Sequence, residues 1–181
     1  MRILIVDDDP NNIKSAQDQT ALFEEAGHTV TIIDNFQVAF DLIDESFGLT
    51  DKPFDFDIGL FDLWMPIGDW TRSVFTPPSS WNPVYKGVKP EQLPAGLVFA
   101  LKFLQQNKKI GIVTDSDHHI DWICNMLDLV SIYKQRSTSQ NVYYFEARGF
   151  RIPNDDRSVN IKDWFAVFNR LLGDENPNPP L

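Results

Sequence analysis

Five apolar, strand-like segments alternate with amphipathic, helix-like segments along the chain, and this alternation restricts the possible folds more than any other feature. The strand-like runs are RILIV (2–6), TVTII (29–33), FDIGLF (56–61), IGIVT (110–114) and VYYF (142–145). Runs that are apolar throughout are typical of parallel strands covered on both faces. The alternation predicts an α/β fold with a doubly wound, five-stranded parallel sheet in the order 2-1-3-4-5.

The helix-like segments have apolar residues three and four positions apart, as amphipathic helices do. The first begins at Pro10 with Asp9 as its N-cap and extends past Phe23. The others cover residues 38–43, 97–104, 120–130 and 161–172. A chain of 181 residues is long enough for one well-buried core. We therefore predict a single domain over residues 1–173 and a flexible C-terminal tail over residues 174–181.

Charge and composition narrow the classes of partner. The net charge is −10, from 16 basic and 26 acidic residues, and a nucleic-acid binder needs a basic face for phosphates. We therefore expect a cation, a basic peptide or another protein surface as the partner, and no nucleic acid. The single cysteine, Cys124, forms no internal disulfide, and neither a signal-peptide pattern nor an apolar run long enough for a membrane span is present. These features predict a cytoplasmic protein without a membrane segment.

Acidic side chains stand where the predicted strands end. The first strand is followed by Asp7, Asp8 and Asp9, and the third ends at Asp62. Parallel strands bring their carboxyl ends to one edge, where two carboxylates about 5 Å apart repel by roughly 3 kcal/mol. Helix capping explains Asp9. For Asp8 and Asp62, we favour a divalent cation, and Mg²⁺ prefers such oxygen ligands.

Three motifs carry a resemblance to a known family. ILIVDDDP (3–10) is followed by LFDLWMP (60–66) and then by GIVTD (111–115). In this order, they resemble the response-regulator receiver family, the phosphoacceptor domains of two-component signalling. The similarity covers most of the chain and implies the flavodoxin-like order of strands, for which a chemotaxis receiver is a known example.

The resemblance also implies roles for individual residues. Asp62 would be the phosphoacceptor, with Mg²⁺ held by Asp7, Asp8, Asp62 and the backbone carbonyl of Trp64. Thr114 and Tyr143 would be the residues that switch on phosphorylation. The partner would be a histidine kinase or a phosphotransfer protein, and the only catalysis would be self-phosphorylation and self-dephosphorylation of Asp62.

One departure concerns the cation that receivers place at the end of their last strand. Read without a gap, the sequence has Glu146 at the position of the family's lysine. A carboxylate there would repel a phosphoryl group. Arg148 lies two residues further along the same strand face, so a register shift restores a cation. Asp115, which follows Thr114, is a second departure, because the family prefers a small residue there. With Glu146 in this position, we expect Mg²⁺ binding and weak retention of a phosphoryl group.

An insertion at about residues 70–95 is the third departure. Asp69 and Gly96 are separated by 26 residues, whereas the family needs only a short turn. The segment holds several large aromatic residues, among them Trp70, Trp81 and Tyr85. Long loops in compact domains are usually functional or disordered, and the aromatic residues favour order. We interpret the insertion as a lid or docking surface, or alternatively as an aromatic plug over an apolar groove.

Other interpretations remain open. A pseudo-receiver would keep the fold and bind partners without phosphorylation, which Glu146 and Asp115 favour. A haloacid-dehalogenase-type phosphatase is suggested by Asp7 and Asp9 in a D-x-D pattern, but the chain has no well-placed late acidic pair. A transition-metal site in DSDHHID (115–121) is disfavoured, because adjacent histidines on a helix diverge by about 100°.

Overall fold

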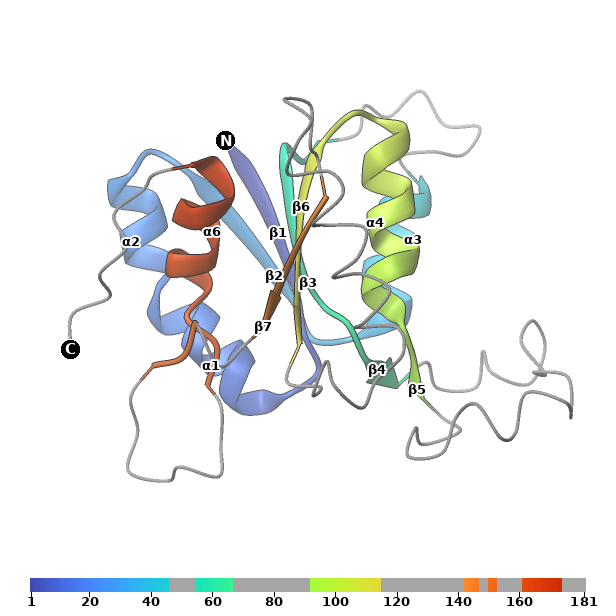
Figure 1. The fold of residues 1–181 in the computed structure, drawn as a ribbon, viewed down its shortest axis with the longest axis horizontal. Helices are drawn as coiled ribbons and strands as arrows, with labels where there is room; N and C mark the ends of the chain where they lie inside the picture. Colours follow the sequence, from blue (N-terminus) through green and yellow to red (C-terminus); the bar gives the residue numbers. More distant parts are fainter. Residues whose placement is uncertain (46–54, 67–91, 115–141, 147–149, 153–160, 174–181) are drawn as a thin grey trace, which may run out of the picture.

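The computed structural model describes residues 1–45, 55–66, 92–114, 142–146, 150–152 and 161–173. Its centre is a five-stranded sheet in the order β2-β1-β3-β6-β7 (Figure 1). The strands are β1 (Arg2–Val6), β2 (Thr29–Ile33), β3 (Ile58–Asp62), β6 (Lys109–Thr114) and β7 (Val142–Glu146). Each neighbouring pair is parallel. The predicted fold and its strand order are therefore confirmed.

Helices cover both faces of the sheet (Figure 1). On one face lie α1 (Pro10–Asp18), α2 (Thr20–Glu25) and α6 (Trp164–Leu172), and on the other lie α3 (Phe36–Glu45) and α4 (Ala95–Gln105). Side chains alternate along the strands, so that Ile3 and Ile5 pack on the first layer, whereas Leu4 and Val6 pack on the second. Burial on both faces explains why the strands are apolar throughout.

The boundaries of two helices differ from the sequence prediction. Asp9 caps α1 as predicted, because its side chain accepts the N–H of Asn11 at 2.7 Å. The chain then divides into α1 and α2 at Gln19, where the hydroxyl of Thr20 turns back to the carbonyl of Ala16 at 3.2 Å. The last helix starts at Trp164, three residues later than predicted, because Asp163 is its N-cap. The helix predicted over 120–130 lies outside the described residues.

A short antiparallel ribbon frames the insertion. β4 (Met65–Pro66) pairs with β5 (Gln92–Leu93), and α4 begins two residues later. The ribbon therefore places Pro66 and Gln92, the described residues that flank segment 67–91, opposite each other. The segment itself, with Trp70, Trp81 and Tyr85, lies outside the described residues, as does the tail over 174–181. The single-domain boundary and the lid or docking role stay predictions.

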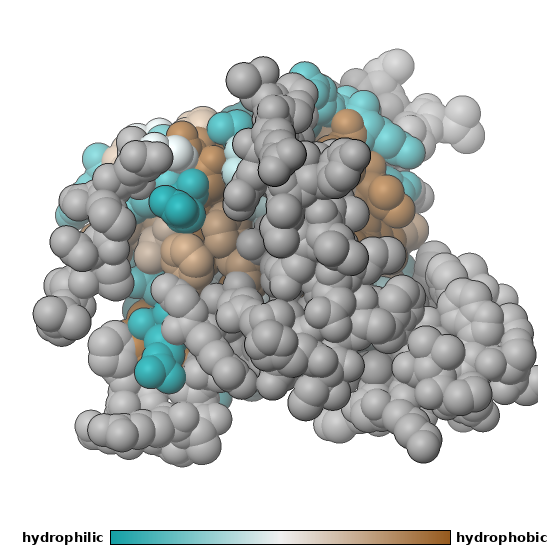
Figure 2. All heavy atoms as spheres, in the orientation of Figure 1, coloured by the Kyte–Doolittle hydropathy of each residue, from teal (hydrophilic) through white to brown (hydrophobic). Residues whose placement is uncertain are grey.

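Apolar surface is visible over the outer side of α4 (Figure 2). Leu101 of α4 is 64% exposed and Val38 of α3 is 56% exposed, which makes them the most exposed large hydrophobic residues described. None of the described helices combines the length and the apolar character that crossing a membrane would take.

Candidate functional site

The carboxyl edge of the sheet gathers the acidic side chains that the sequence places at strand ends. β1, β3 and β6 are neighbours, so Asp7, Asp62 and Thr114 come to the same edge. Asp7 is 1% exposed and Asp62 is 8% exposed. Buried carboxylates need partners that compensate for the lost water.

Asp62 has partners on both carboxylate oxygens. Its Oδ2 accepts the backbone N–H of Trp64 at 2.8 Å, which holds the turn after β3 against the acid. Its Oδ1 forms an ion pair with the ammonium of Lys162. The carboxylate is therefore fixed in orientation at the end of a central strand.

Asp7 is held by a denser set of contacts. Its Oδ1 accepts the N–H of Asp9 at 2.8 Å, and the Nδ2 of Asn12 lies 3.3 Å from Oδ1 and 3.1 Å from Oδ2. Its Oδ2 also accepts a hydrogen bond from the Nζ of Lys162 at 2.6 Å. Asp8, the next residue, is half-buried. Asp7 therefore faces the interior of the site, while Asp8 is more accessible to an ion from solvent.

Lys162 supplies a buried cation that the sequence interpretation did not consider. Lys162 is 1% exposed, and its ammonium lies between the carboxylates of Asp7 and Asp62. The ammonium is also 5.4 Å from the ring centroid of Trp164. The sequence comparison with receivers places the cation at the end of the last strand, whereas Lys162 lies just before α6. The sequence feature that could have indicated Lys162 is its position between the apolar Ile161 and the amphipathic segment that starts at Trp164.

Of the two residues considered for the lysine position, the structure describes one, and only its backbone. Glu146 ends β7, in register with Thr114, and only its backbone is described. Arg148 lies outside the described residues. The cation that reaches Asp62 in the described structure is Lys162, so the choice between Glu146 and Arg148 omitted the residue that occupies the site.

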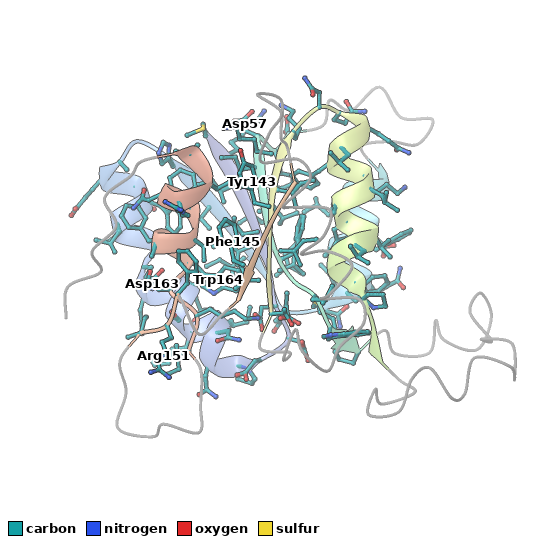
Figure 3. The ribbon with its side chains drawn as sticks, in the orientation of Figure 1. Asp57, Tyr143, Phe145, Arg151, Asp163 and Trp164 are labelled. Atoms are coloured by element: carbon teal, nitrogen blue, oxygen red, sulfur yellow. The ribbon has the colours of Figure 1, made fainter. Side chains whose placement is uncertain are left out.

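The two predicted switch residues lie at different depths along the sheet. Thr114 ends β6 and is 2% exposed, at the carboxyl edge. Tyr143 lies near the amino end of β7, toward the end of the sheet that carries Asp57, whereas Trp164 lies toward the opposite end (Figure 3). The rings of Tyr143 and Phe145 are nearly parallel, with centroids 6.3 Å apart. The switch roles of Thr114 and Tyr143 stay predictions.

Burial and charge shift the acid–base behaviour of the site. Burial raises the pKa of Asp62 to about 7, and the repulsion of Asp7 adds to this rise against the opposing attraction of Lys162. Burial also raises the pKa of Asp8, again with help from Asp7. Burial alone would lower the pKa of Lys162, but Asp62 and Asp7 raise it above its ordinary value. Lys162 is therefore an ammonium at neutral pH.

The donor chemistry suits a hard cation. Asp7, Asp8 and Asp62 offer three carboxylates against one ammonium, which leaves excess negative charge at an edge that solvent reaches through Asp8. In the part of the chain that the structure describes, no three His, Cys, Asp or Glu side chains are already grouped as a metal site. His118 and His119, with Asp115 and Asp117, lie outside the described residues.

The raised pKa of Asp62 makes stability depend on pH. A carboxyl group with a pKa near 7 in the fold and 3.8 when unfolded stabilises the fold fully below pH 3.8, and this contribution is lost as pH rises through 7. We expect Asp62→Asn to remove up to about 4 kcal/mol of the fall in unfolding free energy between pH 4 and pH 8. Urea denaturation across this range measures the effect. Asp34→Asn, at an exposed acid after β2, should keep the wild-type pH profile; an unchanged profile in Asp62→Asn would contradict the assignment.

Gly96 lets the first turn of α4 approach the backbone of Asp62. A Cβ at this position would lie 2.5 Å from the carbonyl oxygen of Asp62 and 3.2 Å from Cα of Leu63. The N–H of Gly96 donates to the carbonyl of Leu63 at 3.3 Å, so the approach is part of the packing.

Gly96→Ala is therefore expected to lower the unfolding free energy by about 1–3 kcal/mol, because the backbone beside Asp62 must move. Chemical denaturation measures the loss. In an unobstructed helix, the same change stabilises by up to about 1 kcal/mol, so a gain in stability would show that no clash exists.

The sequence matches no protein-family model and no curated protein. Receiver domains are among the solved structures that the chain is similar to. A CheY-like response regulator receiver domain from Methanospirillum hungatei is 16% identical, with 98% of each chain covered and a TM-score of 0.42.

Two further structures are a signal receiver domain of an HD domain-containing protein from Pseudomonas fluorescens and the bacteriophytochrome response regulator AtBRR. The first is 12% identical, with 98% of each chain covered and a TM-score of 0.43. The second is 15% identical, covers 99% of this chain and 95% of its own, and has a TM-score of 0.42.

Proposed function

We propose that the chain is a receiver-type signalling domain that accepts a phosphoryl group on Asp62 with the help of Mg²⁺. The observation that carries the proposal is the contact of Lys162 with both Asp62 and Asp7 at the carboxyl edge of the sheet. A nucleophilic carboxylate, a neighbouring acid pair and a buried ammonium are the groups that phosphoryl transfer to an acid requires. The three sequence motifs support the same class.

In the proposed reaction, an oxygen of Asp62 attacks the phosphorus of a phosphodonor. A new oxygen–phosphorus bond forms while the bond from phosphorus to the donor breaks, and the donor leaves with the electron pair. Lys162 pairs with the phosphoryl oxygens, and the N–H of Trp64 orients the carboxylate. Asp7, Asp8, Asp62 and the carbonyl of Trp64 are the proposed Mg²⁺ ligands, and Mg²⁺ would supply positive charge to the phosphoryl oxygens.

Lys162 changes the expected strength of phosphoryl binding. Glu146 at the lysine position predicted weak retention, because a carboxylate repels the phosphoryl group. Lys162 places an ammonium against Asp62, and a hydrogen bond to a charged group contributes about 1.5–3 kcal/mol. We therefore expect ordinary phosphoryl retention, and no improvement from Glu146→Lys.

The test uses acetyl phosphate and Mg²⁺, with intact-protein mass spectrometry to count phosphoryl groups. Wild type should gain one phosphoryl group, Asp62→Asn should gain none, and Asp34→Asn should match wild type. Asp34 is a fair control because it is an exposed acid that also follows a strand. Absence of labelling in wild type with Mg²⁺ would overturn the proposal.

The main alternative is a pseudo-receiver that binds another protein without phosphorylation. It is favoured by Glu146 and Asp115, which follow the sequence positions of Phe145 and Thr114 and are acidic where the family has other residues. An unlabelled wild type that still binds Mg²⁺ would support it. A phosphatase that uses Asp7 and Asp9 together is disfavoured, because Asp9 is engaged as the cap of α1. We propose that a histidine kinase, a phosphotransfer protein or another protein surface is the partner.

A further inference from the structure

One face of α1, continued by its C-cap Gln19, carries three buried polar side chains where an apolar stripe would be expected. Asn12 is 2% exposed, Ser15 is 4% exposed and Gln19 is 7% exposed. They are spaced three and four positions apart, so they form one row along the helix, which we call the α1 polar row. Buried polar groups are costly unless they are hydrogen-bonded, so the bonds of this row indicate its role.

The α1 polar row holds the backbone of Lys162 on both sides. The Oδ1 of Asn12 accepts the N–H of Lys162 at 3.0 Å, and the hydroxyl of Ser15 donates to the carbonyl of Lys162 at 2.7 Å. Gln19 extends the row, because its Nε2 donates to Ser15 at 3.3 Å and its Oε1 accepts the N–H of Phe165 at 2.8 Å. Both backbone polar groups of Lys162 are therefore satisfied by side chains.

Asn12 also connects this anchor to the acidic site. Its Nδ2 donates to Asp7, and its backbone carbonyl accepts the indole N–H of Trp164 at 3.1 Å. An antiparallel bridge to Arg151 also holds this segment: Ile152 donates its N–H to the carbonyl of Ile161 at 2.8 Å, and Asp163 donates its N–H to the carbonyl of Phe150 at 2.7 Å. These bonds fix the residues on either side of Lys162, whereas the N–H and the carbonyl of Lys162 itself are fixed by side chains of α1.

We propose that Asn12 and Ser15 are positioning residues for Lys162, which they hold so that its ammonium reaches Asp62 and Asp7. The inference deepens the proposed function, because a fixed ammonium is what a phosphoryl group on Asp62 would meet. A purely structural role, in which the row only ties α1 to α6, makes a different prediction. It lowers stability without a separate effect on the lysine.

The first test measures Lys162 itself and does not depend on phosphorylation. Native-state labelling with an amine-reactive acylating reagent, read by peptide mass spectrometry, should be about ten-fold faster at Lys162 in Asn12→Leu and in Ser15→Ala than in wild type. Asn11→Leu is the matched control, because Asn11 is the exposed neighbour on the same helix. Hydrogen exchange of the β6 amides reports global opening. Equal labelling in Asn12→Leu and Asn11→Leu, or a rise that only parallels β6 exchange, would overturn the inference.

The second test measures the binding affinity of the protein for beryllofluoride, a phosphoryl analogue, in the presence of Mg²⁺. As a single substitution, Asn12→Leu should weaken beryllofluoride binding about ten-fold. In a protein that already carries Lys162→Met, the same substitution should weaken it by less than about two-fold, because the effects of substitutions at two contacting residues are not independent. Equal losses in both backgrounds would contradict positioning through Lys162. If wild type binds no beryllofluoride, the proposed function fails, and the labelling of Lys162 alone decides the positioning role.

Discussion

Lys162→Met is expected to lower the unfolding free energy by about 3–5 kcal/mol at pH 7. The change leaves Asp7 and Asp62 buried without their cation, and the removal of one partner of a buried ion pair has a cost of this size. The pKa of Lys162 is raised above 10.5 in the fold, so the lysine keeps its charge at neutral pH, and its own titration reduces the contribution only above that value. Urea denaturation measures the loss.

Lys14→Met is the control for this prediction. Lys14 pairs with Asp18 on the surface of α1, with both side chains more than half exposed, and such pairs contribute about 0.5 kcal/mol or less. The loss in Lys162→Met should shrink at pH 5, where Asp62 is protonated. A loss below about 1 kcal/mol at pH 7 would mean that Lys162 does not compensate the buried acids.

Trp164→Ala is expected to lower the unfolding free energy by a similar amount, about 3–5 kcal/mol. Trp164 is fully buried at the start of α6, donates its indole N–H to the carbonyl of Asn12 and lies beside the ammonium of Lys162. Truncation of a buried aromatic residue removes its apolar contacts and leaves a cavity. Thermal and chemical denaturation both measure the effect.

Trp164→Phe separates the packing from the hydrogen bond. Phenylalanine keeps an aromatic ring but removes the indole N–H that donates to the carbonyl of Asn12 and leaves a small void, so the loss should be about 1–3 kcal/mol. Leu101→Ala, at an exposed position on α4, should change stability by about 0.5 kcal/mol or less. A tolerated Trp164→Ala would show that α6 does not depend on this anchor.

The fold was predictable because its information is local. Each strand of a parallel sheet is covered on both faces, so β1, β3 and β6 are visible as apolar runs in the sequence. Asp9 and Pro10 likewise mark the start of α1 within two adjacent residues. The division at Gln19 was not predictable from apolar spacing, because Gln19 is buried by its bonds to Ser15 and Phe165.

The site was predictable only in part. Asp7 and Asp62 follow from the strand ends, because parallel strands share a carboxyl edge. Lys162 could not be predicted in this way, because it is 100 residues from Asp62 in the sequence. It lies in the short segment before α6, which has no periodic pattern of apolar residues. Asn12 was missed for the same reason: a polar residue in a helix gives no sign that its partners lie 150 residues away.

The ribbon of β4 and β5 marks a point where the chain can accept an inserted module, because its two strands hold Pro66 and Gln92 opposite each other. Its antiparallel register places Pro66 opposite Gln92, so a two-residue hairpin turn spans the same gap as the natural segment. Lengthening such a connection costs little, about 0.6 kcal/mol for each doubling. We therefore expect that a fluorescent or affinity module can be inserted between β4 and β5 without changing the register of the central sheet. Met65 of β4 lies only three residues from Asp62 in the sequence. A fluorescent module inserted at this position would therefore be attached close to the acidic site and could report structural changes there.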